Sequence, residues 1–204
     1  SIGLPGSGLL WRIVQDGGVT VDLDSLLASA RVFAIPLVER FRGITLREGI
    51  LLRGPAGWAE FAPFRDYLDA ECVPWLRSAV ESATVPWPQR QRLRIEVNVT
   101  IPVVCEQRAA EIARASGCRT AKVKVADLGV DLGADAWRVA AVRDALGPGG
   151  KIRVDANGAW TVARALEAIE VLDTAAGGLE YVEQPCRTLA ELAHIARSDI
   201  GSIT

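Results

Sequence analysis

The second half of the chain alternates strand-like and helix-like segments at a regular spacing. Each of four short apolar segments has the length of a buried strand and is followed by a segment with helical periodicity. The strand-like segments begin about 25 to 30 residues apart, which is the length of one βα unit. They are 93–101, 120–125, 151–158 and 179–185, and the helical segments are 105–117, 134–147, 161–175 and 188–197. This order predicts a parallel sheet, either doubly wound or closed into a β/α barrel.

The first half of the chain follows a different order. Strand-like segments come first, then a loop that contains glycine and proline, and then a helix. These segments are 31–38, 46–54, 54–64 and about 66–82, with residues 39–45 separating the first two. The proline-rich stretch 84–92 is the natural domain boundary. We therefore predict an unassigned N-terminal extension over 1–26, an α+β domain over 27–91 and a βα domain over 92–204.

Composition and charge exclude several classes of protein. The 204 residues carry a formal net charge of -2 and scattered arginines, which argues against a nucleic-acid partner and against a polybasic membrane surface. No apolar run is long enough to span a bilayer, and no signal-peptide pattern follows Ser1. The four cysteines form no C-x-x-C pair, so free thiols in a cytoplasmic protein are expected. Monomer and homo-oligomer fit the sequence equally.

Polar residues stand near the carboxyl ends of three successive predicted strands. In βα proteins, ligands bind at this end of the sheet. Because side chains alternate along a strand, polar residues two positions apart share one face. A pair of lysines would then lie beside carboxylates from the neighbouring strands. The residues are Lys122 and Lys124 on one strand, Arg153, Asp155 and Asn157 on the next, and Glu180 and Glu183 on the last.

Each of these features, taken singly, has an ordinary structural explanation. A K-x-K strand is usually a solvated edge strand, and an aspartate at a strand end usually caps the next helix. A glutamate before Gln-Pro, such as Glu183, is usually a loop charge, and we interpret Glu180 as one too. The combination favours a functional site, and so does the choice of lysine. The chain has three lysines, two of them on one strand. Arginine is effectively always protonated, whereas the pKa of a lysine falls readily on burial, so a site that needs a base must use lysine.

The two carboxylates Asp155 and Glu183 predict an oxygen-binding divalent cation, most of all Mg²⁺. A Mg²⁺ ion that binds a substrate carboxylate stabilises the dianion formed when the neighbouring carbon loses its proton. A lysine with a pKa tuned down to roughly 7–8 could abstract that proton. The pattern of a lysine base with Mg²⁺ is the one used by enolase-superfamily enzymes.

At these residues the sequence resembles the enolase superfamily, in its muconate-lactonizing-like branch with the K-x-K motif. Within that branch it is similar to the o-succinylbenzoate synthase family of the actinobacterial type. The resemblance implies an α/β fold: an α+β capping domain followed by an incomplete (β/α) barrel with about four βα units. The matching segments lie in the family's order between about Arg31 and Arg197. They are 41–49, 54–64, 119–127, 153–160 and 179–186.

The resemblance also implies a role for each candidate residue. Lys124 would be the acid/base group, and Lys122 would help to hold the substrate carboxylate and favour the neutral form of Lys124. Asp155 and Glu183 would be the first two metal ligands. The family reaction is a Mg²⁺-dependent syn dehydration of a cyclohexadiene carboxylate, a small-molecule substrate, to o-succinylbenzoate for menaquinone synthesis.

Loops of the capping domain close over the substrate in this family. Here they correspond to residues 39–45 and 57–61, so the resemblance implies that Arg42 and Phe61 contact the substrate. A solvated hairpin charge and an aromatic at a domain interface are the ordinary explanations of these two residues.

Other interpretations stay open. The family needs a third carboxylate ligand and a second lysine, both expected beyond Thr204, so the chain looks like a capping domain with half a barrel, either a fragment or one part of an assembly. An N-succinylamino acid racemase or a dipeptide epimerase would use the same K-x-K motif and metal. A catalytically inert fragment or assembly module is the non-enzyme alternative. A nuclease-like two-carboxylate site is disfavoured by the lack of basic surface, and catalysis by His194 is disfavoured by its place on the last helix.

Overall fold

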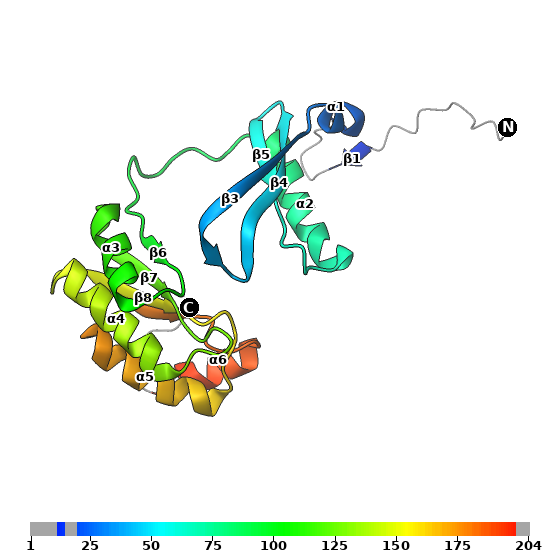
Figure 1. Ribbon diagram of the computed structural model, residues 1–204. Coiled ribbons are helices and arrows are strands. Elements are labelled where there is room, and N and C mark those ends of the chain that lie inside the picture. Colours follow the sequence, from blue (N-terminus) through cyan, green and yellow to red (C-terminus); the bar gives the residue numbers. More distant parts are fainter. Residues whose placement is uncertain (1–11, 15–19, 199–204) are drawn as a thin grey trace. The chain divides into compact units, whose positions relative to one another are not determined.

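The computed structural model describes the backbone of residues 12–14 and 20–198 and divides the chain into two compact units (Figure 1). The first unit contains residues up to Val38 together with Arg42–Leu93, and the second contains Glu39–Phe41 and the residues from Arg94 onward. Part of the predicted extension 1–26 lies outside the described residues. Its described part forms β1 (Arg12–Val14) and β2 (Thr20–Asp22), which pair antiparallel, and the start of α1 (Leu23–Ala28).

The first unit is an antiparallel sheet packed against a helix. The strand order is β3-β4-β5, and helix α2 packs on β4 and β5. Their bounds are β3 (Arg31–Phe41), β4 (Ile44–Gly54), β5 (Gly57–Phe61) and α2 (Asp69–Thr84). The core of this unit consists of small and aliphatic side chains from α1, β4, β5 and α2, among them Leu26, Leu52, Ala59, Val80 and Ala83. The predicted α+β character of this half is therefore present.

Two predictions for this unit were wrong in detail. The strands continue through most of the predicted separator 39–45, and only Arg42 and Gly43 lie between β3 and β4, with φ of 47° and 81°. A two-residue hairpin turn of this kind needs positive φ at both central residues, which glycine adopts freely and arginine does not. Strand β5 lies inside the predicted loop 54–64, where flanking Gly and Pro conceal a short alternation with Ala59 buried.

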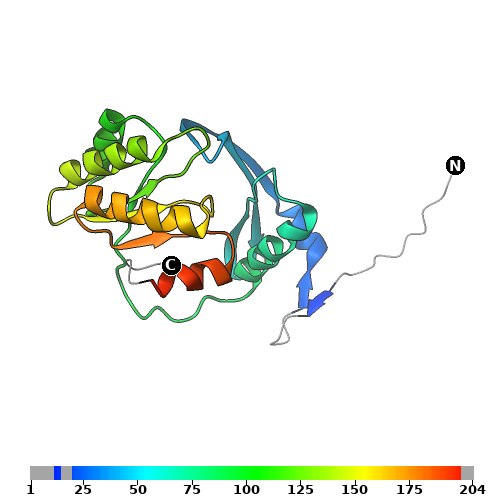
Figure 2. The same cartoon turned by 90° about the horizontal axis from the view of Figure 1, so that it is seen from below.

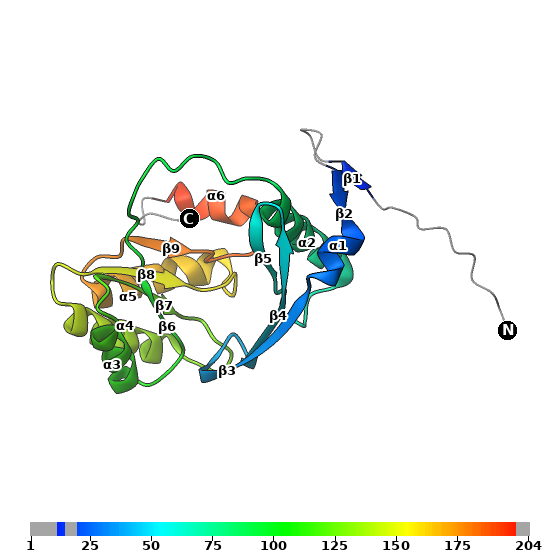
Figure 3. The ribbon, with the colours of Figure 1, turned by 90° about the horizontal axis from the view of Figure 1, so that it is seen from above.

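The second unit is a parallel sheet with strand order β6-β7-β8-β9. Figures 2 and 3 show helices α3, α4 and α5 along one side of this sheet. Helix α3 packs against α4, α4 against α5, and α5 against α6. The strands are β6 (Val99–Ile101), β7 (Thr120–Lys124), β8 (Lys151–Asp155) and β9 (Tyr181–Glu183), and the helices are α3 (Glu106–Ser116), α4 (Leu132–Leu146), α5 (Val162–Ala176) and α6 (Leu189–Ala196). The prediction of four successive βα units is confirmed.

Alternation along the strands gives this sheet two different faces. Residues at every second position are fully buried and pack against the helices, where burial of each aliphatic side chain contributes about 1.5–3 kcal/mol. They include Ala121 and Val123 of β7, Ile152 and Val154 of β8, and Val182 of β9. The intervening residues, which include both lysines of the K-x-K motif, therefore project from the opposite face.

Strand β6 is shorter than predicted. The predicted strand 93–101 pairs only at Val99–Ile101, and Leu93, Ile95 and Val97 are exposed. Strand β7 begins at Thr120, and Ala121 already pairs with Val99, so β7 does not extend far enough to pair with residues before Asn98. The predicted strands 151–158 and 179–185 likewise end at Asp155 and Glu183. No helix in the described part of the chain combines the length and apolar character needed to cross a bilayer.

Candidate active site

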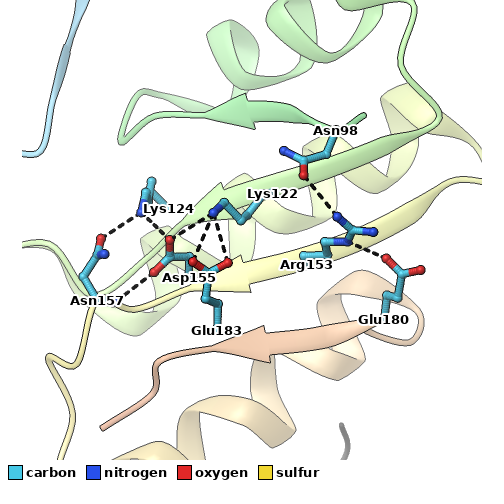
Figure 4. A network of polar contacts seen from close by, with 8 residues as sticks. All are labelled: Asn98, Lys122, Lys124, Arg153, Asp155, Asn157, Glu180 and Glu183. Carbon is cyan, nitrogen blue, oxygen red and sulfur yellow. Dashed lines mark hydrogen bonds and ion pairs between the residues drawn. The ribbon is translucent and has the colours of Figure 1, made fainter. Parts of the chain in front are cut away.

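The strand register places three of the predicted site residues side by side. In the parallel sheet Lys124 of β7 pairs with Asp155 of β8, and Asp155 pairs with Glu183 of β9. Lys122 lies two positions earlier on β7 and therefore projects from the same face. Figure 4 shows these four side chains converging at the carboxyl ends of the strands.

Hydrogen bonds and ion pairs connect the four side chains. Lys122 Nζ lies 3.2 and 3.0 Å from the two carboxylate oxygens of Glu183 and 3.5 Å from Oδ2 of Asp155. Lys124 Nζ donates to Oδ2 of Asp155 and, over 2.9 Å, to Oδ1 of Asn157. Asp155 therefore interacts with both lysines, and each lysine also has a partner of its own.

Burial makes this cluster costly to leave unpaired. Only 1% of the Asp155 side chain is exposed, against 13% for Lys124, 21% for Lys122 and 30% for Glu183. Burial is the largest influence on the pKa of Lys122 and lowers it, but the hydrogen bonds and charges of Glu183 and Asp155 together raise that pKa above its ordinary value. Lys122 is therefore a protonated, positively charged group at neutral pH.

The ordinary structural explanations of these residues do not fit the fold. Strand β7 is an internal strand between β6 and β8, so the K-x-K motif is not on an edge. Helix α5 is capped by Thr161, whose side chain accepts from the backbone N–H of Arg164, and not by Asp155. Glu183 belongs to β9 and pairs with Lys122. The roles assigned to the four residues stay a prediction.

The two predicted substrate contacts lie in the first unit. Arg42 forms the turn between β3 and β4, donates to the Tyr67 hydroxyl over 2.8 Å and lies 4.3 Å from the centroid of the Phe64 ring. Phe61 ends β5 and packs, half-buried, against the core of that unit. Their contact with a substrate stays a prediction as well.

Sequence reasoning left Asn157 without a role. Its side chain reaches Lys124 although strand β8 ends two residues earlier, because Asn157 adopts a φ of 50° and turns back toward the strand. Its backbone N–H also donates to Oδ1 of Asp155 over 3.0 Å. Asparagine tolerates this left-handed backbone better than most residues, and that preference was the available signal.

Glu180 lies in a bend just before β9, where a loop charge was expected, but its carboxylate is paired. Glu180 precedes β9, accepts from Arg153 and lies 2.7 Å from Nζ of Lys151. The hydrogen bond from Lys151, followed by that from Arg153, lowers the pKa of the Glu180 carboxyl. Arg153 also donates to the side chain of Asn98 over 3.1 Å, so these residues form a second polar cluster toward the amino ends of the strands (Figure 4).

The donor set fits Mg²⁺ in its chemistry. Asp155 and Glu183 present carboxylate oxygens from adjacent paired positions, and the N–H of Asn157 orients one of them. Proteins commonly bind Mg²⁺ through one or two carboxylates, with water and substrate completing the coordination. Among the described residues, no cluster of three or more His, Cys, Asp or Glu side chains could hold a metal ion. Asp155 and Glu183 therefore stay the predicted ligands of the cation.

An antiparallel α+β unit followed by parallel βα units with lysines and carboxylates at the strand ends defines a two-unit α/β protein with a lysine–carboxylate site. Comparison with known families agrees with this class. Residues 32–83 match the family described as enolase N-terminal domain-like, and residues 105–202 match the family described as enolase C-terminal domain-like. The chain belongs to the enolase superfamily.

Curated relatives are similar over most of the chain. The o-succinylbenzoate synthase of Thermobifida fusca is 53% identical over 169 residues, which cover 83% of this chain and 53% of the relative. The o-succinylbenzoate synthase of Mycolicibacterium smegmatis is 49% identical over 180 residues, which cover 87% of this chain and 55% of the relative. The chain thus spans about half the length of these curated relatives.

Solved structures show the same architecture. The o-succinylbenzoate synthase from Thermosynechococcus elongatus, complexed with Mg in its active site, matches with a TM-score of 0.55 and 25% identity over 85% of this chain and 66% of that one. A mandelate racemase/muconate lactonizing protein from Herpetosiphon aurantiacus matches with a TM-score of 0.69 and 22% identity over 86% of this chain and 65% of that one. The second likeness shows the fold alone.

Proposed function

We propose that this chain supplies the acid/base lysines and the first two metal ligands of an o-succinylbenzoate synthase. The observation that carries the proposal is the convergence of Lys122, Lys124, Asp155 and Glu183 on one face of the sheet. Support comes from the two curated relatives of that name at about half identity. A part in menaquinone synthesis, a cytoplasmic location and a complete β/α barrel as the surrounding architecture belong to the same proposal.

The proposed reaction is the loss of water from a cyclohexadiene carboxylate. The neutral amine of Lys124 takes the proton from the carbon next to the substrate carboxylate, and the resulting ammonium returns a proton to the departing hydroxide, which leaves as water. The hydrogen bonds from Nζ to Asp155 and Asn157 hold the amine in one place for both transfers.

Lys122 stabilises the negative charge that develops on the substrate carboxylate. It stays protonated because Glu183 and Asp155 raise its pKa, so its charge is available throughout the reaction. Mg²⁺, when bound by Asp155 and Glu183, would act as a Lewis acid toward the same carboxylate. On the family resemblance, Arg42 and Phe61 are proposed substrate contacts.

The proposal is tested by assaying the purified chain for formation of o-succinylbenzoate with and without Mg²⁺. We expect Mg²⁺-dependent turnover in the wild type and a loss of about 10²–10⁴-fold in Lys124→Ala, the usual contribution of a general acid/base group. Lys151→Ala is the matched control, because Lys151 is an exposed lysine of the next strand and its ion pair is with Glu180, outside the proposed site. Undiminished turnover in Lys124→Ala, or none in the wild type, would count against the proposal.

Racemase and epimerase chemistry is the alternative within the superfamily. An L-Ala-D/L-Glu epimerase from Bacillus subtilis shares the fold with a TM-score of 0.62, but at 20% identity the likeness shows nothing beyond the fold. Exchange of the α-hydrogen of a dipeptide with deuterium from solvent, without dehydration of the cyclohexadiene carboxylate, would favour that alternative.

A further inference from the structure

Helix α4 carries a buried ion pair to which the proposed reaction gives no role. The side chains of Asp135 and Arg138 are only 2% and 4% exposed, and Nη1 of Arg138 lies 2.6 Å from Oδ1 of Asp135. Both side chains belong to the second unit, on the helix-covered side of the sheet. A buried pair of this kind needs an explanation, because replacing it with apolar side chains of similar volume is often neutral or stabilising.

The remaining hydrogen bonds of this pair converge on the backbone around Lys124. Nη1 of Arg138 donates to the carbonyl oxygen of Lys124 over 3.1 Å. The backbone N–H of Ala126 donates to Oδ2 of Asp135 over 2.8 Å. The two charged side chains therefore hold the backbone at Lys124 itself and two residues beyond it. Nε of Arg138 also donates to the carbonyl of Val104, between β6 and α3, over 2.8 Å.

The backbone that these two side chains hold has an unfavourable conformation at Ala126. Ala126 has a φ of 62°, a left-handed conformation that costs an alanine roughly 1 kcal/mol or more. Between the two held groups, the N–H of Val125 donates to the carbonyl oxygen of Asp155 over 3.1 Å. The end of β7 is thus fixed on one side by β8 and on the other by α4.

Burial and hydrogen bonding have opposite effects on Asp135. Loss of solvent is the largest influence and raises the pKa of its carboxyl, while the Ala126 N–H and Arg138 lower it. The net direction is upward, so ionised Asp135 is less favourable in the fold than in water. A pair with this cost is better explained by the geometry it imposes than by stability.

We propose that Asp135 and Arg138 are positioning residues for Lys124. By holding the carbonyl of Lys124 and the N–H of Ala126, they fix the direction in which the Lys124 side chain leaves the strand and so bring its Nζ to Asp155 and Asn157. The inference rests on the proposed function of Lys124 as the acid/base group.

Acylation of the lysines by acetic anhydride tests this positioning without any need for turnover. The 204-residue chain has three lysines, so mass spectrometry can follow each separately. In Arg138→Met we expect the rate of acylation of Lys124, relative to that of Lys122, to rise about two- to tenfold. This is the change expected for loss of the hydrogen bond from Arg138 to the Lys124 carbonyl. Lys122 is the internal reference, because the hydrogen bond from Arg138 to β7 goes to the carbonyl of Lys124, and the side chain of Lys122 has Glu183 and Asp155 as its partners.

Arg143→Met is the matched control. Arg143 lies at the other end of α4 and, like Arg138, donates to backbone carbonyls. Its acceptors are the carbonyls of Ala176, Gly147 and Gly150. Its replacement should lower stability without changing the Lys124-to-Lys122 ratio. An equal change of the ratio in both variants, or no change in Arg138→Met, would overturn the inference. Should Arg138→Met fail to fold, Asp135→Asn carries the same test, because it removes the charge and keeps the shape of the side chain.

Turnover separates this inference from the proposed function. In an active wild-type chain, we expect Arg138→Met to lower kcat about tenfold with little change of KM, and Arg138→Lys, which keeps the charge, to restore part of kcat. An equal loss in Arg143→Met would contradict positioning. A wild type without turnover would overturn the proposed function, whereas the acylation ratio would still decide whether the pair positions Lys124.

Discussion

At the scale of single residues, Asp155 is the centre of the candidate site. It is the most buried of the four charged side chains, and both lysines of the K-x-K motif interact with its Oδ2. A buried carboxylate that loses its partner keeps the cost of desolvation without compensation. The two lysines should therefore contribute to the stability of the second unit as well as to the proposed chemistry.

Replacing Lys124 with alanine should lower the free energy of unfolding by about 2–3 kcal/mol, less than the 3–5 kcal/mol for a fully broken buried pair, because Lys122 remains near Asp155. Lys151→Ala should cost about 0.5 kcal/mol, because 62% of that lysine is exposed. Denaturant unfolding of the two variants beside the wild type measures the difference. Equal losses would show that the Lys124–Asp155 contact contributes no special stability.

The ion pairs of Glu180 with Lys151 and Arg153 predict that stability depends on pH. Lys151 and Arg153 lower the pKa of Glu180 below its ordinary value of 4.5, so its contribution to stability is present above that value and is lost as the pH falls through the lower, folded-state pKa. We expect Glu180→Gln to be less stable than the wild type at pH 7 and equally stable near pH 2. A constant difference across this range, measured by thermal unfolding, would contradict the ion pairs.

The residues of the site differ in how far the sequence could reveal them. Alternation along the predicted strands was enough to place Lys122 on the same face as Lys124. That Asp155 shares this face comes from the register of β7 and β8. Asn157 reaches the site through a left-handed turn, and Asp135 and Arg138 through the packing of a helix against a strand end. Spacing within one segment carries no information about such contacts between segments.

At the scale of elements, the sequence predicts the parallel strands well where both neighbours are present. Strand β7 has the length expected from its apolar run within one residue, because β6 and β8 pair with it. The predicted strand 93–101 has the right alternation, but within the described part of the chain only Val99–Ile101 pair with a strand. Strand β5 shows the converse case, since pairing with β4 makes a strand of residues whose composition favours a loop.

The loop after β8 packs closely against the loop after β9 at Gly158. Gly158 has a φ of 74°, and a side chain there would meet Cγ of Arg187 at 3.2 Å. Its N–H donates to the carbonyl of Gln184 over 2.6 Å. We expect Gly158→Ala to lower the free energy of unfolding by about 1–2 kcal/mol.

Gly149→Ala is the control for this prediction, because a methyl group at Gly149 would meet open space in the described part of the chain. We expect its stability to be unchanged or to rise by about 0.5 kcal/mol. Thermal unfolding of both variants measures the difference. Unchanged stability in Gly158→Ala would mean that the two loops do not need this close approach.

At the scale of the whole molecule, the second unit presents two contrasting faces. Its helices cover the apolar face of the sheet, and the opposite face carries the site. Among the described residues, β6 and β9 pair with a neighbour on one side only. The matched residues cover 53% and 55% of two curated relatives, and we propose that the site described here is part of the active site expected in the family.

Metal binding by the chain follows from this partial site. Because both carboxylates also interact with lysines, we expect weak Mg²⁺ binding, with a Kd on the order of 1 mM. The affinity for Mg²⁺ should fall by at least about tenfold in Asp155→Asn and in Glu183→Gln. Glu180→Gln is the control, since Glu180 belongs to the other cluster. Calorimetric titration with MgCl₂ measures the binding. Wild-type affinity in both site variants would place the cation elsewhere.

Chemical rescue can show whether the amine of Lys124 is the group that moves the proton. Supplying ethylamine to Lys124→Ala should restore Mg²⁺-dependent formation of o-succinylbenzoate in proportion to the concentration of the neutral amine, while Asp155→Asn should gain nothing from it. Product formation in Lys124→Ala that equals the wild type without added amine, or that never responds to it, would contradict the claim.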